Sequence, residues 1–137
     1  MVKVGIIGFG FMGKTHFAAY QSDPRARVLG LMSINPESFQ DDSAGNITGQ
    51  GQLADYSSAT IHNTIEELLE DDDIEAISIC TPTHLHTEIA CQAIKKGKHV
   101  LIEKPIAKIN TNRDRFITFL TPIKSSKYPK TNDPIDA

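Results

Sequence analysis

Three glycines near the start of the sequence have the spacing of a phosphate-binding loop. Gly8, Gly10 and Gly13 follow the apolar stretch 2–7 and precede a segment with helical character. In such a loop the first glycine makes the turn out of a strand, the second lets backbone approach a phosphate, and the third lets the helix lie close to the strand. The N–H groups of the helix's first turn would then face the anion. The spacing predicts a dinucleotide site, although FAD and other nucleotides use the same loop, and a glycine turn without a ligand is the alternative.

A lysine and two histidines also have types that could carry chemistry. Lys104 directly follows the apolar run 98–102, and a lysine at the end of a strand can hydrogen-bond a substrate oxygen and relay its proton. From the residues alone, Lys104 would instead be taken as a surface lysine before a loop proline. His84 and His86 lie two positions apart, on different faces of a helix, so a joint metal site is not expected. We expect His84 at the start of the helix, whereas His86 could face a bound cofactor.

Strands and helices alternate along the predicted chain. Apolar strands are expected at residues 2–7, 27–33, 74–79 and 98–102, with at most a short strand near 53–56 inside the polar segment 41–60. Helices are expected at residues 11–22, from Asn35-Pro36 onward, at 64–69 and at 85–94. Thr64 and Glu67 have the spacing of a capping box, in which each side chain accepts from the other residue's backbone N–H.

This alternation predicts an α/β fold, a doubly wound parallel sheet of the Rossmann type with helices on both faces. Right-handed crossovers place the first strand centrally and give the strand order 3-2-1-4-5. Ligands of such sheets bind outside the carboxyl ends of the strands, near the point where the order reverses. Three unusual segments follow strands there, and we expect them to converge on one cleft: Gly8–Gly13, Thr81–His86 and Glu103–Pro105.

Composition restricts the class of protein. With 137 residues the chain is long enough for one domain but short for a complete two-domain dehydrogenase. The net charge of -3 and the lack of a basic cluster argue against nucleic-acid binding. No apolar run has membrane-spanning length, and a strand that begins at Val2 leaves no room for a signal peptide, so a cytoplasmic protein is expected. Cys80 and Cys91 have no metal or redox spacing and are expected to be reduced thiols.

Residues 81–105, TPTHLHTEIACQAIKKGKHVLIEKP, together with GFGFMG at 8–13, resemble the nucleotide-binding half of the Gfo/Idh/MocA family. The resemblance covers about residues 1–107 and rests on T-P-x-x-x-H, a helix that ends in G-K-H-V, and E-K-P. It implies an enzyme that uses NAD or NADP to oxidise or reduce sugars, polyols or related carbonyl compounds. By this resemblance Lys104 matches the family's active-site lysine.

The same resemblance implies the remaining site residues. Glu103 and Pro105 would shape the turn around the lysine, and Thr81, Pro82 and His86 match the segment that lines the cofactor cleft. The full predicted cofactor-binding set is Gly8, Phe9, Gly10, Phe11, Met12, Gly13, Ser33, Thr81, Pro82, His86, Glu103, Lys104 and Pro105. No metal ligand is expected.

The residue expected to meet the ribose departs from the pattern of NAD-binding sites. A site that prefers NAD places an acid at the end of the second strand, about twenty residues after the glycine motif. Here Ser33 stands twenty residues after Gly13, followed by Ile34 and Asn35. No carboxylate would repel a 2′-phosphate, but no Arg or Lys follows immediately to bind one. Ser33 could hydrogen-bond either cofactor, and the sequence favours NADP over NAD.

A second departure is that no α+β substrate domain follows in this sequence. We expect a nucleotide-binding domain at residues 1–120, with one more helix near 116–120, and a polar, poorly ordered tail at 121–137. Such a chain would bind nucleotide and turn over little alone. A free-standing binding or sensing module is one alternative, and a fragment without a selected role is another. The strand at 98–102 would be an unprotected edge, so self-association is a further hypothesis.

Overall fold

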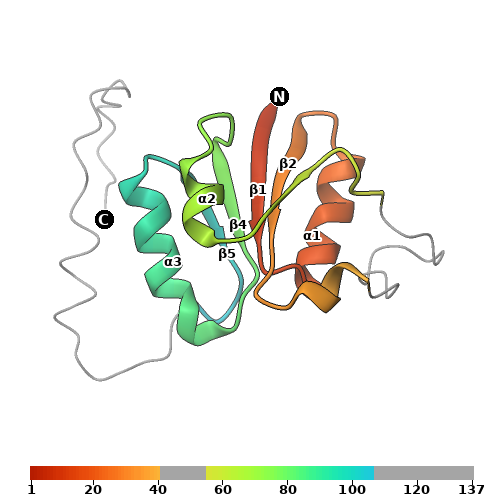
Figure 1. Cartoon of the computed structure of the whole chain (residues 1–137). Coiled ribbons are helices and arrows are strands. Elements are labelled where there is room, and N and C mark those ends of the chain that lie inside the picture. The colour runs from red at the N-terminus through yellow and green to blue at the C-terminus, as the bar shows by residue number, and fades with distance from the viewer. Residues whose placement is uncertain (41–54, 107–137) are drawn as a thin grey trace, which may run out of the picture.

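Five parallel strands form the centre of the protein, in the order β3-β2-β1-β4-β5 (Figure 1). The computed structural model describes residues 1–40 and 55–106. The strands are β1 (Val2–Ile7), β2 (Ala26–Met32), β3 (Thr60–His62), β4 (Ala76–Ile79) and β5 (His99–Ile102). All four neighbouring pairs are parallel, with β1 paired to both β2 and β4. The predicted doubly wound sheet and its strand order are therefore confirmed.

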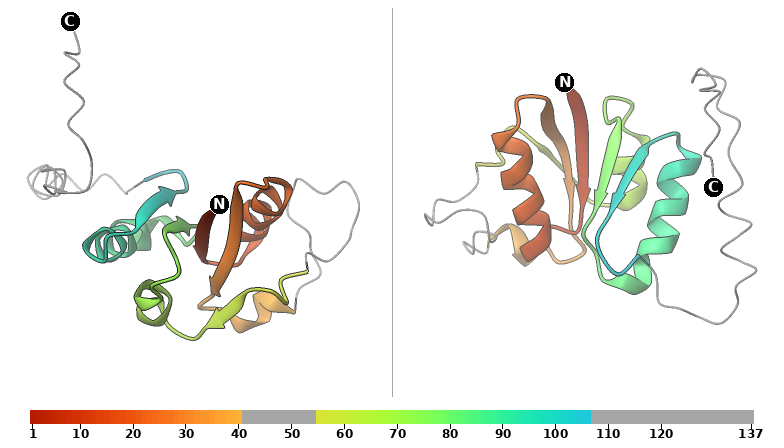
Figure 2. Two further views of the ribbon diagram at one scale, coloured as in Figure 1. Left: turned by 90° about the horizontal axis from the view of Figure 1, so that it is seen from above. Right: turned by 180° about the vertical axis from the view of Figure 1, so that it is seen from behind.

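Helices cover both faces of this sheet. The helix α1 (Phe11–Ser22) and the short 3₁₀ helix η1 (Pro36–Phe39) lie on one face, and α2 (Ile65–Glu70) and α3 (Thr83–Lys95) lie on the other (Figure 2). The segments that join consecutive parallel strands cross over one face of the sheet, as right-handed crossover connections do. The arrangement leaves the carboxyl ends of the strands free at one rim.

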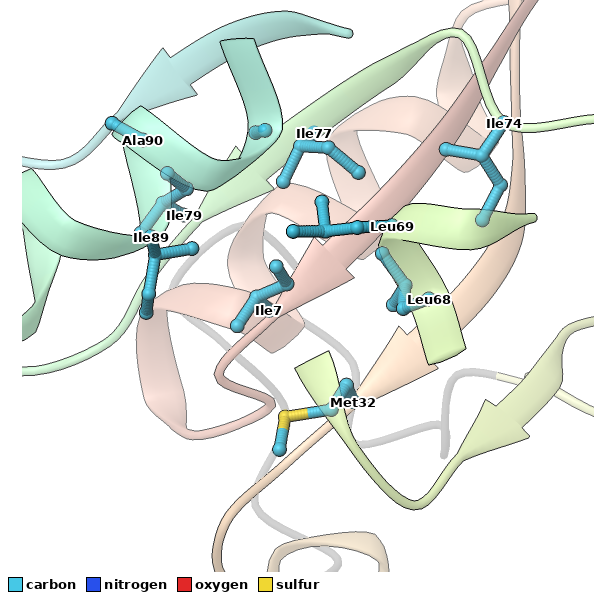
Figure 3. Packing of buried hydrophobic residues seen from close by; sticks show 10 residues of the cluster. Ile7, Met32, Leu68, Leu69, Ile74, Ile77, Ile79, Ile89 and Ala90 are labelled. Carbon is cyan, nitrogen blue, oxygen red and sulfur yellow. The ribbon is translucent and has the colours of Figure 1, made fainter. Parts of the chain in front are cut away.

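Consecutive residues of β1 and β2 point to opposite faces and so form two separate cores. Ile6 and Leu31 pack with Phe17 of α1 on one face. Their neighbours Ile7 and Met32 pack with residues of α2 and α3 on the other (Figure 3). Both cores are almost fully removed from water, and this fixes α1 and α3 relative to the strand ends.

The third strand does not lie where the sequence predicted it. Asp55 and Tyr56 are not in a strand, and Leu53 and Ala54 lie outside the described residues. The strand is instead Thr60–His62, which pairs with Gly30–Met32 of β2. Its residues are mostly exposed and lack a strong apolar pattern, so pairing with β2 rather than local propensity makes this strand.

Local signals at the helix ends were mostly correct. The Thr64 hydroxyl accepts from the Glu67 N–H at 3.1 Å, as predicted, but the Glu67 carboxylate accepts from the Asn63 N–H rather than from Thr64. Gly97 adopts a positive φ of 76° just after α3, as a glycine that ends a helix does. In the part of the chain that the structure describes, no helix is long and apolar enough to cross a membrane. The predicted helix at 116–120, the boundary at 120 and the tail at 121–137 lie outside the described residues.

Candidate functional site

Hydrogen bonds between neighbouring strand ends bring the predicted site segments to one rim of the sheet. The Gly8 N–H donates to Met32 O at 2.8 Å, and the Cys80 N–H donates to Ile7 O at 2.8 Å. The Glu103 N–H donates to Ile79 O at 3.0 Å. The ends of β2, β1, β4 and β5 are therefore joined in a row. Gly8–Gly13, the segment that begins at Thr81 and the turn Glu103–Pro105 follow directly from that row.

The glycine loop has the geometry expected of a tight turn under a closely packed helix. Gly8 has a φ of +94°, and a Cβ there would lie 2.8 Å from the backbone carbonyl of Cys80. A Cβ on Gly13 would lie 2.1 Å from the Gly8 carbonyl oxygen. Both positions therefore require glycine, one for its backbone conformation and the other for contact between helix and turn.

The start of α1 is open toward this rim. Gly10 is the N-cap residue of α1, and no side chain caps the helix's first N–H groups within the described residues. A Cβ on Gly10 would meet nothing within 4 Å, and Phe11 and Met12 are exposed beside it. The uncapped N–H groups and the positive end of the helix dipole can bind an anion such as a diphosphate.

Phe9, also predicted to bind the cofactor, has its side chain in the core. The ring is 1% exposed and packs against Phe17, Phe39 and Tyr56. Only the main chain of Phe9 can therefore contact a ligand. The ring instead anchors the loop to α1 and η1 through an aromatic cluster.

At the end of β4, Thr81 presents a buried polar atom. Its Oγ1 has no hydrogen-bond partner among the described residues, although the residue is only 8% exposed. A buried hydroxyl without a partner carries a desolvation cost that a ligand atom could remove. Pro82 follows as the exposed N-cap residue of α3. Thr81 also lies against the glycine turn, since its backbone N would be 2.9 Å from a Cβ on Gly8.

His86 is a buried residue of α3 that binds main chain. It is 1% exposed, with Nε2 2.6 Å from Thr81 O and Nδ1 3.0 Å from Pro105 O. Both neighbours are carbonyl oxygens, so whichever ring nitrogen carries a proton donates it to the backbone. His86 thus joins the Thr81 segment to the Glu103–Pro105 turn, while His84 is the exposed second residue of α3, near the helix start as expected.

The turn after β5 carries Lys104. This side chain is exposed, and the Lys104–Pro105 peptide bond is cis. Glu103 is partly buried, and its Oε1 lies 2.7 Å from Nε2 of His16. That hydrogen bond is the main cause that lowers the pKa of the Glu103 carboxyl below its ordinary 4.5, although partial burial opposes it.

His16, a residue of α1, was not singled out by the sequence analysis. Its Nδ1 lies 2.7 Å from Ser78 Oγ of β4. A lone histidine on an otherwise ordinary helix gives no local signal of partners 62 and 87 residues away. The packing of α1 against β4, together with the position of Glu103 directly after β5, brings these groups together.

Ser33 lies directly after β2 with its hydroxyl held in a local turn. Its Oγ is 3.0 Å from Asn35 O, 3.3 Å from Asn35 N and 2.9 Å from Ser38 Oγ. These contacts use the capacity of one hydroxyl, so a ribose oxygen would have to replace one of them.

The two cysteines are free thiols and partly buried. Burial raises the pKa of the Cys80 thiol to about 11, an effect that the neighbouring Ser78 hydroxyl partly opposes. Cys80 is thus held in the unreactive thiol form beside the glycine turn. No group of three metal-binding side chains occurs among residues 1–40 and 55–106.

A family model described as "Oxidoreductase family, NAD-binding Rossmann fold" matches residues 2–116. The chain belongs to the Gfo/Idh/MocA family of oxidoreductases. The predicted family, the NAD-binding Rossmann fold and a nicotinamide dinucleotide as the family's cofactor are therefore confirmed. The glycine loop, the Thr81 segment and the E-K-P turn all fall within the matched residues.

Individual members of the Gfo/Idh/MocA family are similar to the chain over the same region. A levoglucosan dehydrogenase from Pseudarthrobacter phenanthrenivorans is 36% identical in an alignment of 115 residues that covers 78% of this chain and 27% of the relative. An enzyme of gentamicin A biosynthesis, GenD2, solved in complex with NAD, superposes with a TM-score of 0.65 at 30% identity, covering 78% of this chain and 28% of that one.

A biliverdin reductase from Synechocystis, solved with biliverdin and NADP+, superposes with a TM-score of 0.63 at 25% identity, covering 77% of this chain and 30% of that one. Solved neighbours therefore include one with NAD and one with NADP. The chain spans 27% of the length of the levoglucosan dehydrogenase and 24% and 30% of two other curated relatives that it matches.

Proposed function

We propose that this chain binds NAD or NADP and is the cofactor domain of an oxidoreductase that moves hydride between a nicotinamide and a sugar, polyol or related carbonyl compound. The observation that carries the proposal is one rim of the sheet on which three features meet. Within residues 1–40 and 55–106, these are the start of α1, which no side chain caps, the Thr81 hydroxyl, which has no hydrogen-bond partner, and the exposed Lys104. The family match supports the cofactor class.

The residues present fit a dinucleotide. The diphosphate would lie at the start of α1, where Gly10 leaves open space and the N–H groups of Phe11 to Gly13 are available. Thr81 Oγ1 is a buried polar atom that still lacks a partner in the described structure, and a cofactor oxygen or amide would supply one. In this proposal Ser33, directly after β2, would meet the adenosine ribose of the cofactor.

A bound nicotinamide supplies the acceptor or donor of hydride. In this proposal Lys104 Nζ holds the substrate oxygen and carries its proton as the hydride moves. Glu103 and Pro105 fix the turn that presents Lys104, and His86 holds that turn to the Thr81 segment. Phe9 and the cores beneath it keep the glycine loop in place.

The substrate class rests on the family resemblance and on the name of one relative. The levoglucosan dehydrogenase supports a sugar-like substrate, whereas the biliverdin reductase shows that the fold also serves a different one. The chain spans only about a quarter to a third of these relatives, so we propose that it binds cofactor but turns over little by itself. The expected preference for NADP and the cytoplasmic location remain predictions.

Titration of the full chain with NADH and NADPH, followed by nicotinamide fluorescence, tests cofactor binding. We expect saturable binding in the micromolar range; no binding of either cofactor would overturn the proposal. Turnover is then measured with a panel of sugars and polyols. Activity that Lys104→Ala abolishes without unfolding the chain would support catalysis, whereas cofactor binding without turnover fits a binding or sensing module.

A further inference from the structure

We propose that His16 is a positioning residue for the turn that carries Lys104, which it holds through the Glu103 carboxylate. The effect of His16 on cofactor binding rests on the proposed function. The contacts of His16 with Ser78 and Glu103 do not. His16 is a residue of α1, whose start lies at the glycine loop. It would therefore connect that helix to the Glu103–Pro105 turn at the other end of the site.

His16 bridges two strands from above the sheet. Its Nδ1 lies 2.7 Å from Ser78 Oγ in β4, and its Nε2 lies 2.7 Å from Glu103 Oε1 just after β5. The His16 and Glu103 side chains are 15% and 25% exposed, so water competes little for this contact. The Tyr20 ring packs edge-on at 6.4 Å from the imidazole and restricts its orientation.

The partners fix where the proton of His16 lies. An ionised carboxylate only accepts hydrogen bonds, so Nε2 donates to Glu103 Oε1. Nδ1 then faces the Ser78 hydroxyl, which can donate to it. The same hydroxyl also lies 3.9 Å from Cys80 Sγ. The imidazole is therefore held at both nitrogens and has a defined tautomer.

This serine, histidine and glutamate have the order of a nucleophilic triad, but the serine cannot act as a nucleophile. Ser78 is 0% exposed, and its strand is covered on both faces. No substrate can approach Oγ without opening the sheet. The arrangement therefore serves to orient Glu103.

The Glu103 carboxylate also restrains the main chain of Lys104. Its Oε2 accepts from the Lys104 N–H at 3.2 Å, while its own N–H donates to Ile79 O in the sheet. One carboxylate oxygen is thus bound to α1 and the other to the main chain of the lysine. The charged and titratable groups that face this carboxylate are His16 from α1, Cys80 after β4 and Lys104 beside it. Loss of the His16 contact should free the carboxylate and, with it, the backbone at Lys104.

Two variants of His16 separate this role from simple packing. His16→Gln places an amide nitrogen near the position of Nε2 and keeps a donor for Glu103. His16→Asn is shorter, so it can keep a contact with Ser78 but not with Glu103. Both are uncharged and polar, and urea unfolding of each chain shows whether it is folded.

The first readout needs no cofactor. The backbone amide shift of Lys104 reports the ionisation of the Glu103 carboxylate that accepts from it, and NMR can follow it from neutral to acidic pH. The midpoint in the native chain should lie below the ordinary 4.5 of a glutamate. His16→Asn should raise this midpoint toward 4.5, and His16→Gln should leave it low. A midpoint unchanged by His16→Asn would overturn the proposal.

The second readout compares NADH with ADP-ribose, which lacks the nicotinamide. If the Glu103–Pro105 turn contacts the nicotinamide half of the cofactor, His16→Asn should weaken NADH binding by about tenfold, the size expected when one hydrogen bond between the turn and the cofactor is lost, and leave ADP-ribose binding unaffected. Lys104→Ala should cause a similar loss, and the double variant should lose no more than either alone. Equal weakening of both ligands would indicate general damage and overturn the positioning role. If the native chain binds neither ligand, the proposed function fails, while the amide titration still decides the role of His16.

Discussion

Gly13 packs against Gly8 so closely that a Cβ on Gly13 would lie 2.1 Å from the Gly8 carbonyl oxygen. This contact places the first turn of α1 directly over the end of β1, where the backbone N–H groups can face a ligand. The neighbouring Gly10 has the opposite environment, since a Cβ there meets nothing within 4 Å. The two glycines therefore serve different purposes, one in folding and the other in binding.

Gly13→Ala should destabilise the fold. The methyl group would meet a backbone oxygen that cannot rotate away, so α1 must move off β1. We expect the free energy of unfolding to fall by about 1–3 kcal/mol, the range for overpacking in a well-packed core. Urea denaturation followed by circular dichroism measures the change. If Gly13→Ala were as stable as the native chain, α1 would have to lie farther from the Gly8 carbonyl than this contact requires.

Gly10→Ala should weaken NADH binding and should destabilise the fold less than Gly13→Ala does. The methyl group extends into open space at the start of α1, where we propose that the diphosphate lies. Alanine is a poorer N-cap than glycine, so the free energy of unfolding should fall by about 0.5–1 kcal/mol. We expect the methyl group to cost the bound diphosphate at least about 1.4 kcal/mol, which corresponds to a tenfold fall in NADH affinity. Unchanged affinity would place the diphosphate elsewhere.

Ser33→Asp should shift cofactor preference toward NADH. A carboxylate at the end of β2 can accept from the ribose 2′-OH and repels a 2′-phosphate. It can also still accept from the Asn35 N–H, as Ser33 does at 3.3 Å, so the local turn should survive. We expect the ratio of NADPH to NADH affinity to fall by about tenfold or more. Ser33→Asn is the neutral control, and an equal shift in that variant would exclude charge as the cause.

The Glu103 carboxyl should add an acid-sensitive component to stability. The hydrogen bond from His16 is the largest cause that lowers the Glu103 pKa in the folded chain. The stabilisation is therefore complete above the ordinary pKa of 4.5 and is lost as the pH falls through the lower folded value. Between about pH 5 and pH 3, native stability should fall more steeply than that of Glu103→Gln. In a His16→Asn background, Glu103→Gln should make a smaller difference to this slope, because only the Lys104 N–H and charge then still lower the Glu103 pKa.

Leu101 should control self-association if the β5 edge of the described sheet drives it. Its side chain is 52% exposed, whereas Val100 and Ile102 on either side pack toward the core. Leu101→Lys should raise the proportion of monomer measured by light scattering at high concentration, because a charged edge resists pairing. Ile61→Lys on β3 is the matched control, since Ile61 is 48% exposed on the opposite edge of the described sheet. A monomeric native chain would count against self-association altogether.

The confirmed predictions about turns and helix ends depend on the backbone requirements of a few neighbouring residues. Gly8 needs a positive φ, the Thr64 hydroxyl accepts from an N–H three residues away, and Gly97 ends α3. Each is a property of a few consecutive residues, and the order of the strands then follows from alternation and handedness. The third strand was misplaced because Thr60–His62 depends on its partner β2 more than on its own side chains.

The amino-acid pattern was enough to predict the Rossmann fold, the family and the three segments at the carboxyl ends of the strands. How those segments are held became visible in the folded chain. The tertiary structure placed Phe9 in an aromatic cluster, directed both nitrogens of His86 to main-chain carbonyls, and joined His16 to Ser78 and Glu103. A glycine turn is specified by neighbours in the chain, whereas a side-chain bridge depends on where helices cross strands, and no short stretch of sequence contains that information.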